Sequence, residues 1–156
     1  MKAIVDTAYL LPTFGIGVKE LSDTALLELR RHVLQGNLQL YCLTTIWSEL
    51  LGKVHREAAK HGIPLTQVET SIKALFNPKI YKWIKPGPKT IQLAYKIRSL
   101  GHKDDIDNLL YAAAQTRGCI LLSMDTALKQ FLQAKNLDTS NIKDHRQLLQ
   151  ELASQH

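Results

Sequence analysis

Short apolar segments alternate with amphipathic segments along this chain, and this alternation constrains the fold more than any other feature. KAIVD at 2–6, LQLYCL at 38–43 and CILLSMD at 119–125 have the length and composition of buried strands. KIYKWIK at 79–85 alternates apolar and basic residues and predicts a further short strand. Because strands separated by helices form βαβ units, we expect an α/β fold: a three-layer α/β/α sandwich around a central, mainly parallel sheet.

Capping and terminating residues delimit the helices between these strands. Ser22 is a plausible N-cap and Gly36 a terminator, and Thr44 or Thr45 can cap the helix that Gly62 ends. The expected helices run over 22–36, 44–62, 64–77, 89–101, 104–118, 125–136 and 141–156. A loop marked by Pro12, Gly15 and Gly17 follows the first strand.

The length of 156 residues suits one domain, 1–156, with a single core. No apolar run approaches the ~18 residues of a membrane span. Asp6 interrupts the apolar start, and no small-residue cleavage site follows, so the start predicts a buried strand and not a signal peptide. Cys42 and Cys119 lie in apolar runs and indicate buried free thiols, with a disulfide as the alternative, so we expect a cytoplasmic protein.

The formal net charge is +6 and the sequence pI is about 9.4. This balance favours a polyanionic partner, although a merely soluble basic protein is the alternative. A cluster of acidic residues on such a chain therefore requires a specific explanation.

Acidic residues are expected at one edge of the predicted sheet. In parallel α/β sheets, polar groups for chemistry collect beyond the carboxyl ends of the strands. Asp6 ends the first strand and Asp125 ends the strand CILLSMD. Glu49 lies one turn into the helix after the second strand, among apolar neighbours, and can face the same edge.

A third acidic position lies at the start of the alanine-rich helix. Asp104 and Asp107 are one turn apart on one face of this helix. Capping and compensation of the helix dipole explain Asp104 and Asp105 as well as a functional role would. Asp107 directly precedes the apolar stretch NLLYAAA, which favours it over Asp104 as the functional acid, although Asp104 is a competing or additional ligand.

Gathered carboxylates repel one another, so a fold that keeps them together is expected to hold a cation. Oxygen ligands select Mg²⁺ or Mn²⁺, and no Cys/His spacing suggests zinc. Such a site can activate a water for phosphodiester hydrolysis.

The segments VDTAYLL, TTIWSELL and DNLLYAAAQTRGCILLSMD, in this order and spacing over residues 1–135, resemble the motifs of PIN-domain proteins. The motifs look like those of VapC-like toxin ribonucleases of prokaryotes and their archaeal cousins. The resemblance implies a metal-dependent endoribonuclease with Mg²⁺ or Mn²⁺, often dimeric and often silenced by an antitoxin. The acids that match the family's motif are Asp6, Glu49, Asp107 and Asp125. Thr7 and Ser123 match the family's hydroxyl residues beside these acids.

Other residues are candidates for contact with nucleic acid. On the helix of Glu49, the basic residues form either a solvated face or phosphate contacts. Trp83, amid basic residues, can stack on a base or pack at a domain or dimer edge. Trp47 is expected in the core and the histidines at the surface, with contact to the substrate as the alternative for His102. The basic residues are Lys53, His55, Arg56 and Lys60.

The resulting hypothesis is an endoribonuclease that cuts single-stranded RNA and leaves a 5′-phosphate and a 3′-hydroxyl. The resemblance also implies that this chain can be the toxin of a toxin–antitoxin pair. The alternatives are a non-catalytic RNA-binding or assembly module and a nuclease for structured DNA. Apolar segments around residues 63–84 can support a homodimer or a higher homo-oligomer.

Overall fold

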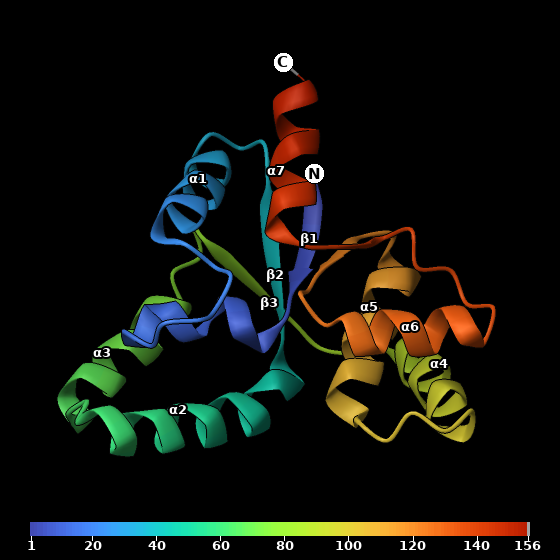
Figure 1. The fold of residues 1–156 in the computed structure, drawn as a ribbon, viewed down its shortest axis with the longest axis horizontal. Coiled ribbons are helices and arrows are strands. Elements are labelled where there is room, and N and C mark those ends of the chain that lie inside the picture. The colour runs from blue at the N-terminus through green and yellow to red at the C-terminus, as the bar shows by residue number, and fades with distance from the viewer. Residues whose placement is uncertain (156) are drawn as a thin grey trace.

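Five strands form one sheet in which every neighbouring pair is parallel. The structure is a computed structural model and describes residues 1–155. The strand order is β3-β2-β1-β4-β5, so the first strand lies at the centre (Figure 1). The strands are β1 (Lys2–Val5), β2 (Gln39–Leu43), β3 (Tyr81–Ile84), β4 (Ile120–Leu122) and β5 (Ile142–Lys143).

Helices cover the sheet on both faces. Figure 1 shows α4, α5 and α6 together on one side of the sheet and α1 with α7 on the other. The α-helices are α1 (Asp23–Leu34), α2 (Trp47–His61), α3 (Leu65–Leu75), α4 (Pro88–Ser99), α5 (Asp105–Arg117), α6 (Thr126–Ala134) and α7 (His145–Ser154). The 3₁₀ helices are η1 (Thr7–Tyr9), η2 (Leu11–Phe14) and η3 (Thr44–Ile46). This arrangement is the three-layer sandwich that the alternation of strands and helices predicts.

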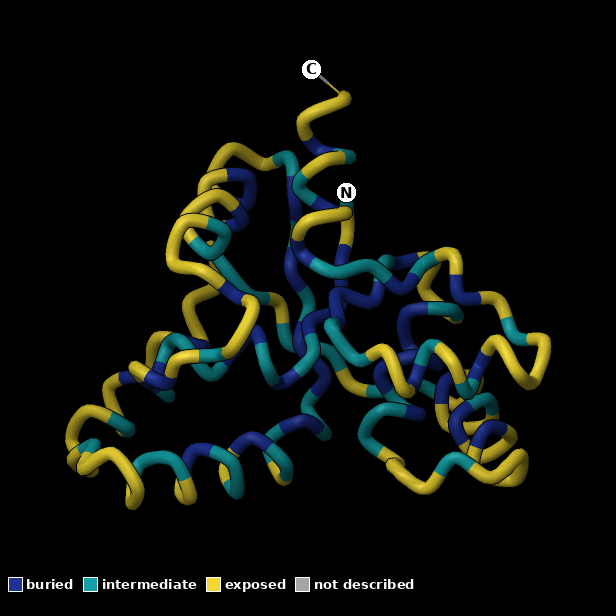
Figure 2. The backbone as a smooth tube through the Cα atoms, viewed as in Figure 1, coloured by how far each residue is buried: buried dark blue, intermediate teal, exposed yellow. Residues whose placement is uncertain are grey.

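The core lies along the central strand. Ala3, Ile4 and Val5 of β1 are all buried, and so are Leu121 and Leu122 of β4. Strands covered on both faces need apolar side chains on both faces, which is why these segments are continuous apolar runs. Figure 2 shows the buried backbone concentrated along the sheet, while the outer parts of α2 and α3 are exposed.

Three local predictions were wrong. The segment after residue 140 contains the edge strand β5, paired with β4, before α7 begins at His145, and is not one helix from residue 141. The loop expected at Pro12, Gly15 and Gly17 is present only at the two glycines, since the 3₁₀ helices η1 and η2 occupy residues 7–9 and 11–14. The second helix is preceded by η3, and neither threonine makes a side-chain cap there.

Burial also corrects the expectation of surface histidines. His32 and His145 are buried, and the backbone amide of His145 donates a hydrogen bond to the Tyr9 hydroxyl. Cys42 and Cys119 are buried free thiols, as expected. Among residues 1–155, no helix combines the length and apolar character needed to cross a bilayer.

Candidate functional site

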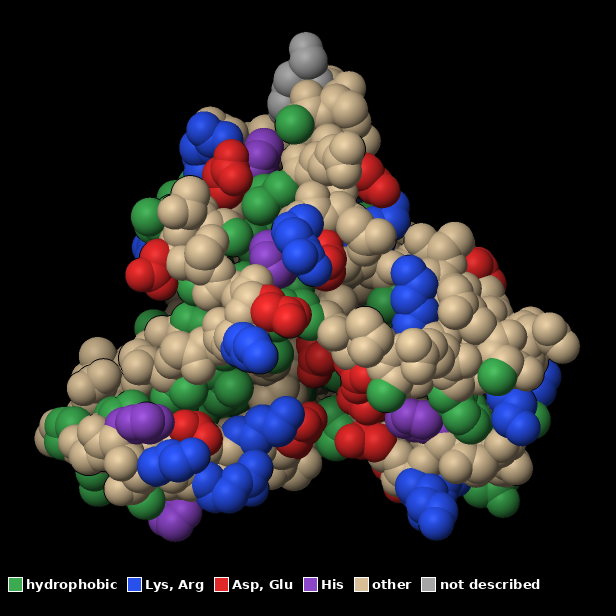
Figure 3. All heavy atoms as spheres, in the orientation of Figure 1, with side chains coloured by type: hydrophobic (Ala, Val, Ile, Leu, Met, Phe, Trp, Pro, Cys, Tyr) green, Lys and Arg blue, Asp and Glu red, His purple; other side chains and the backbone are tan. Residues whose placement is uncertain are grey.

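Acidic side chains from four separate segments meet at the carboxyl end of the central strands. Asp6 directly follows β1, and Asp125 is the N-cap of α6, three residues after β4 ends. Glu49 lies in the first turn of α2 and Asp107 in the first turn of α5. Figure 3 shows Asp and Glu side chains gathered in the hollow at the centre of the molecule, with Lys and Arg side chains on the adjoining surface.

The Asp6 carboxylate is half-buried and accepts two hydrogen bonds. Its Oδ1 accepts from the backbone amide of Thr7 at 2.6 Å, and its Oδ2 accepts from the Ser123 hydroxyl at 2.9 Å. Burial raises the pKa of Asp6 because water no longer solvates the charge, and the nearby Glu49 charge adds to the rise. The two hydrogen bonds oppose this rise but do not reverse it.

Thr7 connects Asp6 to Glu49. The Thr7 side chain is fully buried, and its hydroxyl donates to Glu49 Oε2 at 2.9 Å. The other carboxylate oxygen of Glu49, Oε1, forms an ion pair with Lys53 Nζ at 2.6 Å, one turn along α2. We call the cluster of Asp6, Glu49, Asp107 and Asp125 the acidic group. The ammonium group of Lys53 is paired with this group through Glu49.

Ser123 connects Asp6 to the α6 segment. Its hydroxyl donates to Asp6 and also accepts the backbone amide of Asp125 at 3.1 Å. The carboxylate of Asp125 accepts the amide of Leu128 at 2.9 Å and so caps α6. Two hydroxyl residues thus fix β1, α2 and α6 relative to one another at this edge.

Asp104 and Asp107 have different roles at the start of α5. Asp104 is exposed and caps the helix, with Oδ1 accepting the amide of Asp107 at 3.0 Å. Within residues 1–155, no hydrogen bond to the half-buried carboxylate of Asp107 is found. Burial, and then the charges of Asp104, Asp6, Asp125 and Glu49, raise the pKa of Asp107 to about 8. Asp105 is exposed and pairs with Arg98 at 3.4 Å.

A buried asparagine next to Asp107 holds this part of the site in place, and the sequence interpretation missed it. The amide of Asn108 donates to the His102 carbonyl at 2.9 Å, and its Oδ1 lies 2.8 Å from Nδ1 of the His102 ring. The His102 ring also packs against Phe131, with 5.0 Å between centroids. His102 is thus held by the fold, and the signal that could have revealed this is a polar residue inside an apolar, alanine-rich helix.

The predicted nucleic-acid contacts are only partly near the acids. Lys53 lies at the site because it forms an ion pair with Glu49. The other basic residues are exposed farther along α2: His55, Arg56 and Lys60. The Trp83 indole donates to the Leu75 carbonyl at 2.8 Å. Its ring stacks with Trp47 at 5.0 Å and with Phe76 at 5.4 Å between centroids. This geometry matches the packing alternative for Trp83, and it places Trp47, which is half-buried, in an aromatic cluster at the edge of the core.

The four carboxylates of the acidic group are the kind of ligand that a hard divalent cation prefers. All of them are oxygen ligands, and the raised pKa values of Asp6 and Asp107 show a repulsion and desolvation that a cation would offset. Within residues 1–155, no three Asp, Glu, His or Cys side chains are arranged to hold a metal ion as they stand. Two of these carboxylates have other partners: Glu49 contacts Thr7 and Lys53, and Asp125 accepts the amide of Leu128.

The fold is shared with a protein of known structure. A crystal structure of PAE2754 from Pyrobaculum aerophilum is similar over 99% of this chain and 96% of that chain, with a TM-score of 0.64 and 16% sequence identity. At this identity the likeness concerns the fold alone. No family model matches the sequence, and no curated protein is significantly similar to it.

Proposed function

We propose that the protein is a metal-dependent endoribonuclease of the PIN type that hydrolyses single-stranded RNA. The observation behind this proposal is the convergence of acids from four segments at one edge of the sheet, where burial first, and then the neighbouring acidic charges, raise the pKa of Asp107 to about 8. Purely structural acids would be paired or exposed, as Asp105 is with Arg98. An unpaired, half-buried carboxyl group among other acids is typical of a site that binds a cation.

In this proposal, Asp6, Glu49, Asp107 and Asp125 hold Mg²⁺ or Mn²⁺, directly or through water, and Asp104 lies one helical turn away. When bound, the ion would lower the pKa of a water and offset the charge of the phosphate. Thr7 and Ser123 keep the carboxylates of Glu49 and Asp6 oriented. Release of Glu49 from Lys53 would free one carboxylate oxygen for the ion and the ammonium group for the phosphate of the substrate.

The basic surface beside the acids supports a polyanionic substrate. The net charge is +6 although the site itself is acidic, so most of the positive charge lies outside the site. In this proposal Lys53, beside Glu49, and Arg56, farther along α2, contact the RNA backbone, which supplies affinity without sequence preference.

The wider biological role is also part of the proposal. The resemblance of the motifs to those of toxin ribonucleases suggests a cytoplasmic enzyme that an antitoxin protein inhibits. Exposed apolar side chains of α2 and of the α3–β3 region, including Leu51, Leu65 and Phe76, support a homodimer or higher homo-oligomer. Light scattering after size-exclusion chromatography measures this state, and a monomer at all concentrations would contradict it.

The direct test is the change Asp6→Asn, which keeps the shape of the side chain and removes its charge. Because loss of an outer partner of a metal site costs about 10–100-fold, loss of a ligand is expected to reduce cleavage of labelled single-stranded RNA by at least about 100-fold with Mn²⁺. Asp23→Asn, at an exposed position in the first turn of α1, is the matched control and should retain full activity. Equal activity of Asp6→Asn and the wild type would refute the proposal.

Two further measurements separate the alternatives. Calorimetric titration with Mn²⁺ that shows no binding to the wild type would favour a non-catalytic RNA-binding module. Cleavage of flap or duplex DNA in preference to single-stranded RNA would favour a nuclease for structured DNA.

A further inference from the structure

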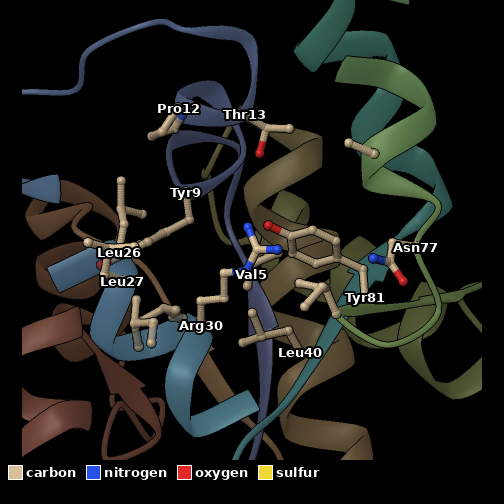
Figure 4. Close-up of a pocket in the computed structure, with 14 residues that line it drawn as sticks. Val5, Tyr9, Pro12, Thr13, Leu26, Leu27, Arg30, Leu40, Asn77 and Tyr81 are labelled. Atoms are coloured by element: carbon tan, nitrogen blue, oxygen red, sulfur yellow. The ribbon is translucent and has the colours of Figure 1, made fainter. Parts of the chain in front are cut away.

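A cavity of about 310 Å³ lies between α1 and the sheet, apart from the acidic group. Its volume is at the low end of the ~300–1,000 Å³ typical of ligand pockets, and its walls are mainly apolar. Figure 4 shows side chains from several elements pointing into it. Its lining includes Val5, Leu26, Arg30, Leu40, Tyr81 and Leu122.

Arg30 is the only charged residue among those that line the cavity. Within residues 1–155 it forms no ion pair, whereas its neighbour Arg31 pairs with Glu28 at 3.5 Å. Figure 4 shows the Arg30 guanidinium directed toward the Tyr81 ring in the middle of the cavity. Arg30 is an exposed residue, and its guanidinium, which has no acidic partner there, is free to form a charge-assisted pair with an anion in the cavity.

Tyr81 adds a hydrogen-bond donor at the same point. Burial raises the pKa of the Tyr81 phenol, so the hydroxyl keeps its proton at neutral pH. The Thr13 hydroxyl and the Asn77 side chain also line the cavity. A few polar groups that converge in an apolar chamber are the usual features of a site for a small organic molecule.

We propose that this cavity binds a small organic anion, a carboxylate attached to a compact apolar body. The carboxylate pairs with the Arg30 guanidinium and accepts a hydrogen bond from the Tyr81 hydroxyl. The apolar body contacts Leu26 and Leu40. A bidentate pair of this kind satisfies the planar guanidinium in a way that water does only in part.

The cavity borders β1 and β4, the two strands that lead to the acidic group. Val5 and Leu122 line the cavity, and the residues that follow them are Asp6 and Ser123. The amide of Asp6 also donates to the Leu122 carbonyl at 3.1 Å. Binding in the cavity requires neither a metal nor RNA, so this proposal can be tested independently of the ribonuclease function.

The test is an NMR titration of the metal-free wild type with phenylacetate and with octanoate, and with phenylacetamide as the uncharged match of the first. At least one carboxylate is expected to shift amide signals of the lining residues, including Val5 and Leu122, and phenylacetamide should bind at least about tenfold more weakly than phenylacetate. No binding of either carboxylate at millimolar concentration, or equal binding of phenylacetate and its amide, would overturn the proposal.

Two variants test whether the guanidinium of Arg30 is the group that binds the carboxylate. Arg30→Met keeps a long apolar stem and removes the guanidinium, and carboxylate affinity is expected to fall at least about tenfold. Arg31→Met, one residue along α1 and outside the cavity lining, is the matched control and should bind as the wild type does. Unchanged affinity in Arg30→Met, or equal losses in both variants, would contradict the assignment.

Discussion

At the scale of single residues, hydroxyl side chains determine how the acids are held. Thr7 and Ser123 each donate to one carboxylate, and both are buried. Thr7→Val keeps the shape of the side chain and removes the donor to Glu49. The half-buried carboxylate of Glu49 then loses a charge-assisted hydrogen bond. We therefore expect the free energy of unfolding to fall by about 1–2 kcal/mol in a urea titration.

The matched control for Thr7→Val is Thr70→Val on α3. The Thr70 hydroxyl is exposed and bonds to the Thr66 carbonyl of its own helix at 2.9 Å. Its loss is expected to change stability by no more than about 0.5 kcal/mol. Equal effects of the two substitutions would show that the Thr7–Glu49 hydrogen bond contributes little.

Asp107 predicts a pH dependence of stability in the metal-free protein. Its pKa is raised from 3.8 to about 8, so between these values the folded state retains a proton that the unfolded state has lost. The folded state binds more protons in this window, and stability therefore falls as the pH rises from about 4 to about 8. In Asp107→Asn, unfolding measured in EDTA at pH 5 and pH 8 should show a smaller fall than in the wild type.

Asp105→Asn is the comparison for this pH effect, since Asp105 lies on the same helix turn but is exposed beside Arg98. Its pH dependence should match that of the wild type. A wild-type protein that gains stability between pH 5 and pH 8, with no difference in Asp107→Asn, would contradict the shifted pKa.

At the scale of elements, Asn108 couples the loop before α5 to the helix itself. Its side chain is fully buried and makes two contacts with His102. In Asn108→Ala the His102 carbonyl loses its donor, and a loss of about 1–3 kcal/mol in unfolding free energy is expected, with faster amide exchange in the first turn of α5. Gln92→Ala, at an exposed position of α4, should leave both unchanged, and equal protection of α5 in Asn108→Ala would contradict this role.

Elements with a strong local signal could be predicted from the sequence. The strand segments around Ile4, Cys42 and Leu121 are apolar on both faces, and the alanine-rich helix has a cap at Asp104 and a terminator at Gly118. These local features suffice to predict the fold class. The same local features place Asp6 directly after β1, whereas β4 ends three residues before Asp125.

Elements that depend on long-range pairing could not be predicted in this way. The strand β5 has two residues, Ile142 and Lys143, and exists because it pairs with β4. The ion pair of Lys53 with Glu49 and the stack of Trp83 on Trp47 likewise depend on side-chain directions set by packing. The burial of His145 follows from its contact with Tyr9, which is distant in the sequence.

At the scale of the whole molecule, the central strand β1 contributes to both sites. Val5 lines the cavity beside α1, and Asp6, the next residue, belongs to the acidic group. The end of β1 thus lies between the apolar cavity, which Arg30 lines, and the acidic group. The two sites differ in the ligand charge that each would accept, so their ligands should bind without competing for the same side chains.

Binding of a divalent cation should stabilise the whole fold, because the ion interacts with the folded state alone. At a free Mn²⁺ concentration 100 times the dissociation constant, the gain is about 2.7 kcal/mol. The carboxyl group of Asp107, with a pKa of about 8, must lose its proton to bind the ion, so the gain should be larger at pH 8 than at pH 6.5. Thermal unfolding with Mn²⁺ or with EDTA at the two pH values measures this. Asp6→Asn should lose most of the gain and Asp23→Asn should keep it, whereas equal gains in both variants would mean that Mn²⁺ binds elsewhere.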